Sequence, residues 1–198
     1  MKKSDSNRID YSKNEKQMKD AFIELLDKIP IEKISIQQLA NKANVSRGTF
    51  YLHFDNIYQL LEKIEDDLIN ELRIINKDFH LFSLPNHDLT KMSTVPYFYE
   101  TYEWIRKNKL YIKVLFGING SPSFKNKWRS CIYEIFSKKI KHDNIRVIDE
   151  DMFCTAVSSS WLGVIESWIN LRDDMNSESL SKIIGIMTKN ILVGFDNR

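Results

Sequence analysis

Glycine and proline are scarce in this chain, with six and four among its 198 residues. Together they make up about 5% of the sequence, against roughly 12% in an average protein. Their scarcity excludes a collagen-like repeat and a Pro- or Gly-rich disordered chain. It also disfavours a β-sandwich or barrel, because the many short strands of those folds are joined by turns rich in both residues. The sequence therefore predicts an all-α fold built from long helices.

The length of the chain and its two cysteines further limit the kinds of protein that it can be. With 42% hydrophobic residues, the chain can bury the core of one large domain or two small ones. Cys131 and Cys154 have no CxxC or metal-ligand spacing, which predicts a reducing, cytoplasmic location without a metal site. No apolar run approaches the ~18 residues of a spanning helix, and no signal-peptide pattern follows Met1. We expect neither a cofactor nor a membrane partner.

The first thirty residues divide into two parts. Residues 1–11 are polar and without periodicity, which predicts a flexible N-terminal arm. From Ser12, whose spacing to Glu15 is that of a capping box, apolar residues recur at helical intervals as far as Pro30. The sequence predicts an amphipathic helix between Ser12 and Pro30.

Two short helices follow. The first begins at a capping box that starts at Ser35, and it ends near Ala43. Asn44 stands where the chain must turn, and asparagine accepts the left-handed conformation that such a turn needs. The second helix has Ser46 as its N-cap and continues to Phe54. We assign residues 12–56 to one domain on this basis.

The remaining residues, 57–198, form a second predicted domain. Its first helix has Asp55 as a candidate N-cap and keeps helical spacing to Ile75. Residues 80–93 contain Pro85 and predict a loop. Further helices are predicted near 94–107, 109–117, 122–141, 149–171 and 177–193.

The two short helices between Ser35 and Phe54 have the spacing of a helix-turn-helix, whose second helix enters the major groove of DNA. Base edges there present distinct donors and acceptors. An alternative is a helical hairpin without a partner. The residues that we expect to face DNA are Gln37, Gln38, Ser46, Arg47, Gly48, Thr49, Tyr51 and His53.

These side chains suit different parts of a DNA surface. Arg47 can donate to guanine or phosphate, and Thr49 can bond a base or touch a thymine methyl. Gly48 lets the helix approach the DNA backbone, while Tyr51 and His53 offer donors to phosphate oxygens. Both glutamines are expected to point unpaired amides at the sugar-phosphate edge. His53 has a second interpretation, as a capping or packing residue.

Residues 14–64 resemble the DNA-binding domain of the tetracycline-repressor (TetR/AcrR) family of bacterial regulators. The strongest likeness lies in 34–40 and 43–54, where Val-Ser-Arg-Gly-Thr-Phe-Tyr-Leu-His-Phe fits the family's pattern for the end of the turn and the recognition helix. The resemblance implies an all-helical homodimer with an N-terminal three-helix DNA-binding domain. It also implies a C-terminal domain for ligand and dimer contacts.

Three positions depart from the family pattern. Asn44 replaces a glycine, Leu52 an aromatic residue that is frequent there, and Ile57 a lysine that commonly touches phosphate. The last two departures predict weaker contact with the DNA backbone. Basic residues could offset that loss, namely Lys42 or the arm residues Lys2, Lys3 and Arg8.

The predicted helix near 149–171 carries two stripes. One is bulky, with Phe153, Val157, Trp161, Val164 and Trp168. The other is made of small residues that let another helix approach closely, namely Ala156, Ser160, Gly163 and Ser167. Together with Ile183 and Met187 on the last helix, the small stripe predicts the four-helix dimer interface that the resemblance implies. The alternative is a helix pair within one chain.

The sequence favours a regulator over an enzyme, because its four histidines are scattered and no catalytic or phosphate-binding motif occurs. We expect a ligand-responsive repressor that binds a palindromic double-stranded DNA operator as a homodimer. Control by a protein partner, or a helical enzyme with a vestigial motif, are the alternatives. No ligand-binding residue is assigned. The basic segment 102–146 is expected to pair with acids of the last two helices or to attract an anion.

Overall fold

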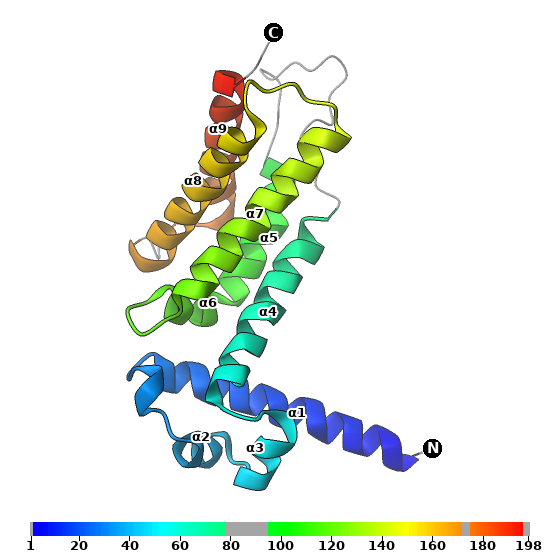
Figure 1. Ribbon diagram of the computed structural model, residues 1–198, viewed down its shortest axis with the longest axis vertical. Helices are drawn as coiled ribbons and strands as arrows, with labels where there is room; N and C mark the ends of the chain where they lie inside the picture. The colour runs from blue at the N-terminus through cyan, green and yellow to red at the C-terminus, as the bar shows by residue number, and fades with distance from the viewer. Residues whose placement is uncertain (1, 78–94, 172–174, 196–198) are drawn as a thin grey trace. The chain divides into compact units, whose positions relative to one another are not determined.

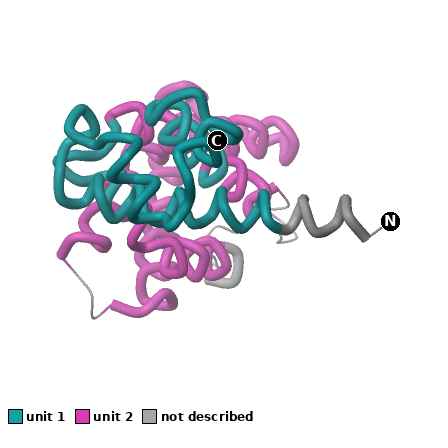
Figure 2. Tube along the Cα trace, turned by 90° about the horizontal axis from the view of Figure 1, so that it is seen from below, with its two compact units in different colours: residues 1–68, 114–121 teal, residues 69–113, 122–198 magenta. Residues whose placement is uncertain are grey.

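The computed structural model describes residues 2–77, 95–171 and 175–195, without side-chain detail at 2–9 and 95–97. Within these ranges the regular structure is helical, and no strand occurs. The predicted all-α fold is confirmed. The predicted loop at 80–93 lies outside the described residues. The chain forms two compact units: unit 1 has residues 1–68 and 114–121, and unit 2 has residues 69–113 and 122–198 (Figure 2).

Unit 1 is built on a long first helix (Figure 1). Its elements are α1 (Lys2–Leu26), the 3-10 turn η1 (Ile31–Lys33), α2 (Ile36–Ala43), α3 (Arg47–His53) and the first part of α4 (Ile57–Ile75). Helix α1 begins at Lys2 rather than near Ser12, so residues 2–11 are helical where an irregular arm was expected. Neither glycine nor proline interrupts residues 1–26, and polar residues alone do not end a helix.

The core of unit 1 lies where α1, α2 and α3 pack on one another. Met18 and Phe22 of α1 are fully buried, as are Leu39 of α2 and Phe50 of α3. The rings of Phe50 and Phe54 lie 5.8 Å apart between centroids. Phe50 lies on the inner face of α3, and Phe54, the C-cap residue directly after the helix, is buried beside it, so the opposite face of α3 is left to solvent.

The N-cap of α4 differs from the prediction. Asn56, not Asp55, caps the helix: its Oδ1 accepts the Gln59 backbone N–H at 3.0 Å. The Gln59 side chain accepts in turn from the Asp55 backbone N–H at 2.6 Å. Asp55 and Asn56 both have a side-chain oxygen that could cap the helix. The reciprocal bonds with Gln59 make Asn56, the later of the two, the N-cap.

Unit 2 holds the remaining helices, α5 (Val95–Lys107), α6 (Lys109–Phe116), α7 (Pro122–His142), α8 (Glu150–Leu171) and α9 (Ser177–Phe195), with α6 divided between the units. Helix α8 packs on α7 and α9, and α9 also packs on α5. Trp161 lies at the centre of an aromatic core. Its ring meets Phe98 at 4.7 Å and Phe136 at 5.3 Å, both edge to face.

The basic segment of unit 2 is partly neutralised by acids of α8. Lys125 of α7 lies 2.5 Å from a carboxylate oxygen of Glu166, and Lys141 lies 3.2 Å from Glu150. The Ser137 hydroxyl also donates to Glu150 at 2.7 Å. These pairs agree with the expectation that the segment pairs with acidic groups of the last two helices.

Candidate functional site

Helices α2 and α3 form a helix-turn-helix. The turn begins at Asn44, which has φ 54° and ψ 42°, and the Val45 N–H donates to the Ala40 carbonyl at 3.0 Å. This left-handed residue redirects the chain within three positions, as predicted. Helix α3 then begins after Ser46. The turn therefore fixes the angle between the two helices through backbone bonds.

The outward face of α3 is formed by Arg47, Gly48, Tyr51 and Leu52, which are all exposed. Tyr51 is 50% exposed and Leu52 is 77% exposed. Three of the four belong to the predicted DNA-facing set. Leu52 does not, because the sequence suggested only a lost aromatic contact there. No acidic residue occurs between Ile36 and His53, so no carboxylate of this segment would repel an anionic partner.

Gln37 and Gln38 are exposed on α2, but their amides are not unpaired as predicted. The Oε1 of Gln38 accepts from both the backbone N–H and the hydroxyl of Ser35 at 3.0 Å. The Nε2 of Gln37 donates to Asn41 Oδ1 at 2.8 Å. The capping box competes for the glutamine oxygen because the first N–H groups of a helix have no partner within it.

Ser46 and Thr49 hold the start of α3. Ser46 Oγ accepts the Thr49 backbone N–H at 2.9 Å, which confirms the predicted N-cap. The two hydroxyls also share a hydrogen bond at 2.9 Å. Thr49 is half-buried. The Thr49 hydroxyl therefore already has a hydrogen-bond partner in the protein.

His53 packs against α1. Its ring stacks on Tyr11 with 3.7 Å between centroids and 24° between planes. Among the residues that the structure describes, none hydrogen-bonds its buried Nδ1. Burial lowers the pKa of His53, although the nearby Glu15 carboxylate acts in the opposite direction. The geometry favours the packing interpretation of His53 over the phosphate-contact one.

Tyr11 was missed by sequence reasoning because it falls in the predicted arm. One signal could have found it: Tyr11 lies seven positions before Met18, a fully buried residue of α1, and two helical turns place such residues on similar faces. Continuing the helical period back past Ser12 would have included Tyr11 in the same amphipathic helix.

An ion-pair network ties α1 to the first part of α4 within unit 1. The Lys19 ammonium contacts Glu15 and lies 2.6 Å from Asp67, which also pairs with Lys63 at 2.7 Å. Burial alone would raise the pKa of Asp67, but hydrogen bonds from both lysines outweigh it and lower the pKa. A separate pair joins Lys42 to Glu24 at 2.5 Å, so the lysine expected to offset weak DNA contact already has an acidic partner.

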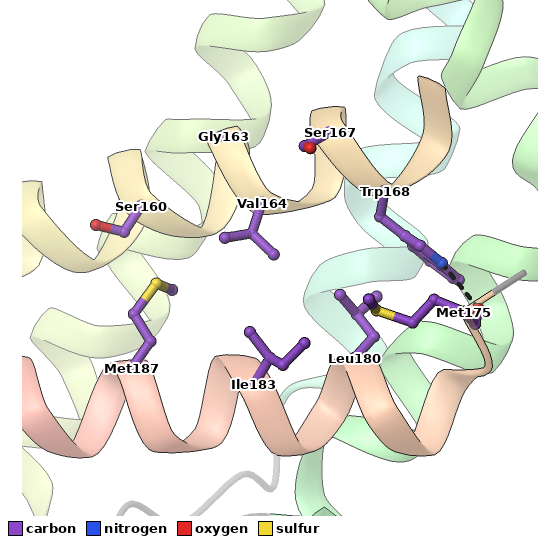
Figure 3. Close-up of a pocket in the computed structure, with 9 residues that line it drawn as sticks. All are labelled: Ser160, Gly163, Val164, Ser167, Trp168, Met175, Leu180, Ile183 and Met187. Atoms are coloured by element: carbon purple, nitrogen blue, oxygen red, sulfur yellow. Dashed lines mark hydrogen bonds between the residues drawn. The ribbon is translucent and has the colours of Figure 1, made fainter. Parts of the chain in front are cut away.

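A second candidate site lies in unit 2, between α8 and α9 (Figure 3). Figure 3 shows Val164 pointing from α8 toward Leu180 and Ile183 of α9. We call this open, mostly apolar hollow the α8–α9 groove. Its lining residues are Ser160, Gly163, Val164, Ser167, Trp168, Met175, Leu180, Ile183 and Met187. The groove brings together every residue of the predicted dimer set except Ala156.

The described part of the chain offers little support for a metal site, a membrane span or a reactive cysteine. Residues 2–77, 95–171 and 175–195 contain no cluster of three potential metal ligands. No helix in the same ranges has the length and apolar character to cross a membrane. Cys131 and Cys154 are buried free thiols, and burial raises their pKa to about 11 and about 12.

These features define a helix-turn-helix protein with a separate helical domain. Residues 20–64 match the family described as "Bacterial regulatory proteins, tetR family". Residues 93–190 match the tetR-type "Transcriptional regulator C-terminal region". The chain belongs to the tetR family of bacterial regulatory proteins, which confirms the family resemblance.

The chain is similar to an uncharacterized HTH-type transcriptional regulator, YxbF of Bacillus subtilis, at 22% identity over 85% of this chain. It spans 43% of the length of that relative. A TetR regulator from Streptococcus agalactiae has a similar structure, with TM-score 0.64, 24% identity, and 93% and 98% of the two chains covered. The operon activator DhaS also matches, with TM-score 0.59, 19% identity and coverages of 93% and 98%. Membership of this family of regulatory proteins favours a regulator over an enzyme.

Proposed function

We propose that this protein regulates transcription by binding double-stranded DNA through the outward face of α3. The observation that carries the proposal is the exposed set Arg47, Gly48, Tyr51 and Leu52 on the second helix of a helix-turn-helix. A helix of this kind fits the major groove, where an arginine can bond guanine or phosphate. Ser46 and Thr49 support the surface by holding the start of that helix.

The working form in this proposal is a homodimer that joins through the α8–α9 groove. Phe153, Val157 and Trp161 of the bulky stripe are buried in their own chain, whereas Val164 and Trp168 of the same stripe line the groove. The small stripe faces outward: a Cβ added at Gly163 would meet no atom within 4 Å. The glycine is therefore not needed for packing inside one chain. Its absent side chain is explained if a helix of a second subunit approaches there.

Exposed apolar side chains on α9 also support the α8–α9 groove as the dimer interface. Ile183 is 44% exposed and Ile186 is 51% exposed, and both line hollows of this helix with Met187. Contiguous exposed apolar side chains of this kind are typical of interaction sites. Two copies joined here would present two α3 helices, and a palindromic operator with half-sites one helical turn apart would match that symmetry.

The regulatory step in this proposal is a population shift. A small molecule bound in unit 2 would favour a dimer whose two α3 helices no longer fit successive major grooves, and affinity for the operator would fall. Repression is the expected outcome, while DhaS, named as an operon activator, has the same fold and motivates testing both signs of regulation.

DNA binding is tested by selecting duplexes from a random pool and measuring affinity for the enriched sequence. Arg47→Ala should lower affinity about tenfold or more, because it removes a base or phosphate contact. Lys33→Ala removes the same charge from an exposed position outside α2 and α3 and should leave affinity within about threefold. Equal losses for both variants, or no enrichment by the wild type, would refute the proposed surface.

Dimer formation is tested by sedimentation of the full chain at micromolar concentration. Ile183→Glu should convert the dimer to a monomer, because it buries an unpaired charge in the groove. Lys182→Glu changes the charge next to it at a position that does not line the groove and should remain dimeric. A monomeric wild type would exclude the dimer.

A further inference from the structure

Leu52 is the most exposed apolar side chain of α3, at 77%. It occupies a helix whose other large apolar residue, Phe50, is fully buried. A leucine carries neither donor nor acceptor, so it offers nothing to a phosphate oxygen. Covering an exposed apolar side chain with a partner lowers the free energy, because apolar surface is removed from water.

Helix geometry places Leu52 on the side of α3 that lies opposite the buried residue Phe50. Successive residues turn by about 100°, so Gly48 and Leu52 each lie within about 20° of the direction opposite Phe50. Arg47 and Tyr51 lie further round on one side, and the half-buried Thr49 and His53 lie on the other. A Cβ added at Gly48 would meet only Ser46 Oγ, at 3.5 Å. The side of α3 opposite Phe50 therefore consists of bare backbone and the leucine side chain.

The charge near Leu52 favours DNA over an apolar protein surface as its partner. Residues 36–53 contain no acidic residue, and Arg47 is exposed on the same helix, whereas Lys42 pairs with Glu24. A side chain on the outward side of such a helix can reach base edges on the floor of the major groove. The apolar group that the floor presents is the C5-methyl of thymine, which cytosine and the purines lack.

We propose that Leu52 contacts a thymine methyl group and selects thymine at one position of each half-site. The inference rests on the proposed DNA binding and adds a base preference to it. In this role Leu52 does not replace the lost aromatic flank contact with the DNA backbone. It exchanges a sequence-independent contact for one that reads a base.

The test removes the methyl group alone. After duplex selection, each thymine of the enriched site is replaced in turn by uracil, which keeps all hydrogen bonds of the base. For wild-type protein, one replacement per half-site should weaken binding about three- to fivefold, the effect of exposing roughly one methyl group. In Leu52→Ala the same replacement should change affinity by less than about 1.5-fold. Ile74→Ala, which truncates an exposed aliphatic residue outside the helix-turn-helix, should behave as wild type.

The outcomes separate the two proposals. If the wild type enriches duplexes but uracil acts equally on wild type and Leu52→Ala at every position, the thymine contact is wrong and DNA binding stands. A site without thymine in the central part of each half-site would have the same meaning. If no duplex is enriched, the proposed function itself fails. Because Leu52 is mostly in solvent, Leu52→Ala is expected to fold, and its circular dichroism and urea midpoint check this.

Discussion

Replacing Tyr11 with alanine should loosen the recognition helix from α1. Tyr11 is 48% exposed, so about half of the roughly 150–250 Å² of an aromatic side chain is buried. At about 25 cal/mol per Å², that burial stabilises by about 2 kcal/mol. The 3.7 Å stack on His53 adds about 0.5–1.5 kcal/mol, while alanine returns about 0.5 kcal/mol of helix propensity. After burial in the unfolded chain is discounted, we expect a net loss of about 2 kcal/mol.

Urea unfolding followed by far-UV circular dichroism measures this loss, with affinity for the selected duplex measured in parallel. Tyr11→Phe keeps the ring and should stay within about 0.5 kcal/mol of wild type. The alanine variant should also bind DNA more weakly, because the end of α3 would lose its support. If both variants match wild type in stability and affinity, the stack does not position the recognition helix.

The same stack gives a pH dependence with a definite sign. Because burial lowers the pKa of His53 in the folded protein, the unfolded chain takes up a proton first as the pH falls below about 6.5. The stabilisation is therefore complete above that pH and is lost as the pH falls through the folded pKa. The carboxylate of Glu15 opposes the lowering of the His53 pKa, and the ring is only partly buried, so the effect is small. Tyr11→Ala should flatten this slope between pH 7.5 and 5.5, and an unchanged slope would contradict the assignment.

Three further perturbations test the supporting contacts. Ser46→Ala should cost about 1 kcal/mol by removing the N-cap, whereas Ser46→Asp should keep the cap and lose DNA affinity by repulsion; urea unfolding and duplex titration measure the two effects. Thr188→Val leaves the buried indole N–H of Trp161 without its 2.9 Å acceptor and should cost about 1–3 kcal/mol in urea, while Thr188→Ser keeps the bond; equal losses would count against it. Because the pKa of Asp67 is lowered, its pairing with Lys19 stabilises above about pH 3.9 and fades below it, so Asp67→Asn should remove that part of the acid transition.

Helix ends were predictable from sequence where a residue fixes them chemically. Ser35 and Ser46 cap the starts of α2 and α3, and Pro122 begins α7. The start of α1 was mispredicted because the capping-box spacing of Ser12 and Glu15 suggested a boundary there, whereas the helix continues back to Lys2 through polar residues without glycine or proline. The 3-10 turn after Pro30 was also missed, since three residues carry no periodicity.

The candidate site was predictable in outline and not in its hydrogen bonds. The spacing of Phe50 and Phe54 was enough to predict which face of α3 is outward. The partner of His53 was not, because Tyr11 lies 42 positions away in the sequence and the two meet only in the folded unit. Gln38 shows the same limit over a shorter range: the capping box was recognised, but not that it would occupy the amide oxygen.

The capping bonds of α2 and α3 divide the residues of this surface into two groups that differ in how freely they can be substituted during evolution. Gln38 and Ser46 change at a cost, because their side chains hold the starts of α2 and α3, and the Thr49 hydroxyl bonds to Ser46. Arg47 and Leu52 have no such duty, so exchanging them alters what is read without endangering the scaffold. A duplicated copy of such a gene could acquire a new target sequence through these positions in a few steps. Divergence of regulatory circuits is then concentrated on a handful of codons.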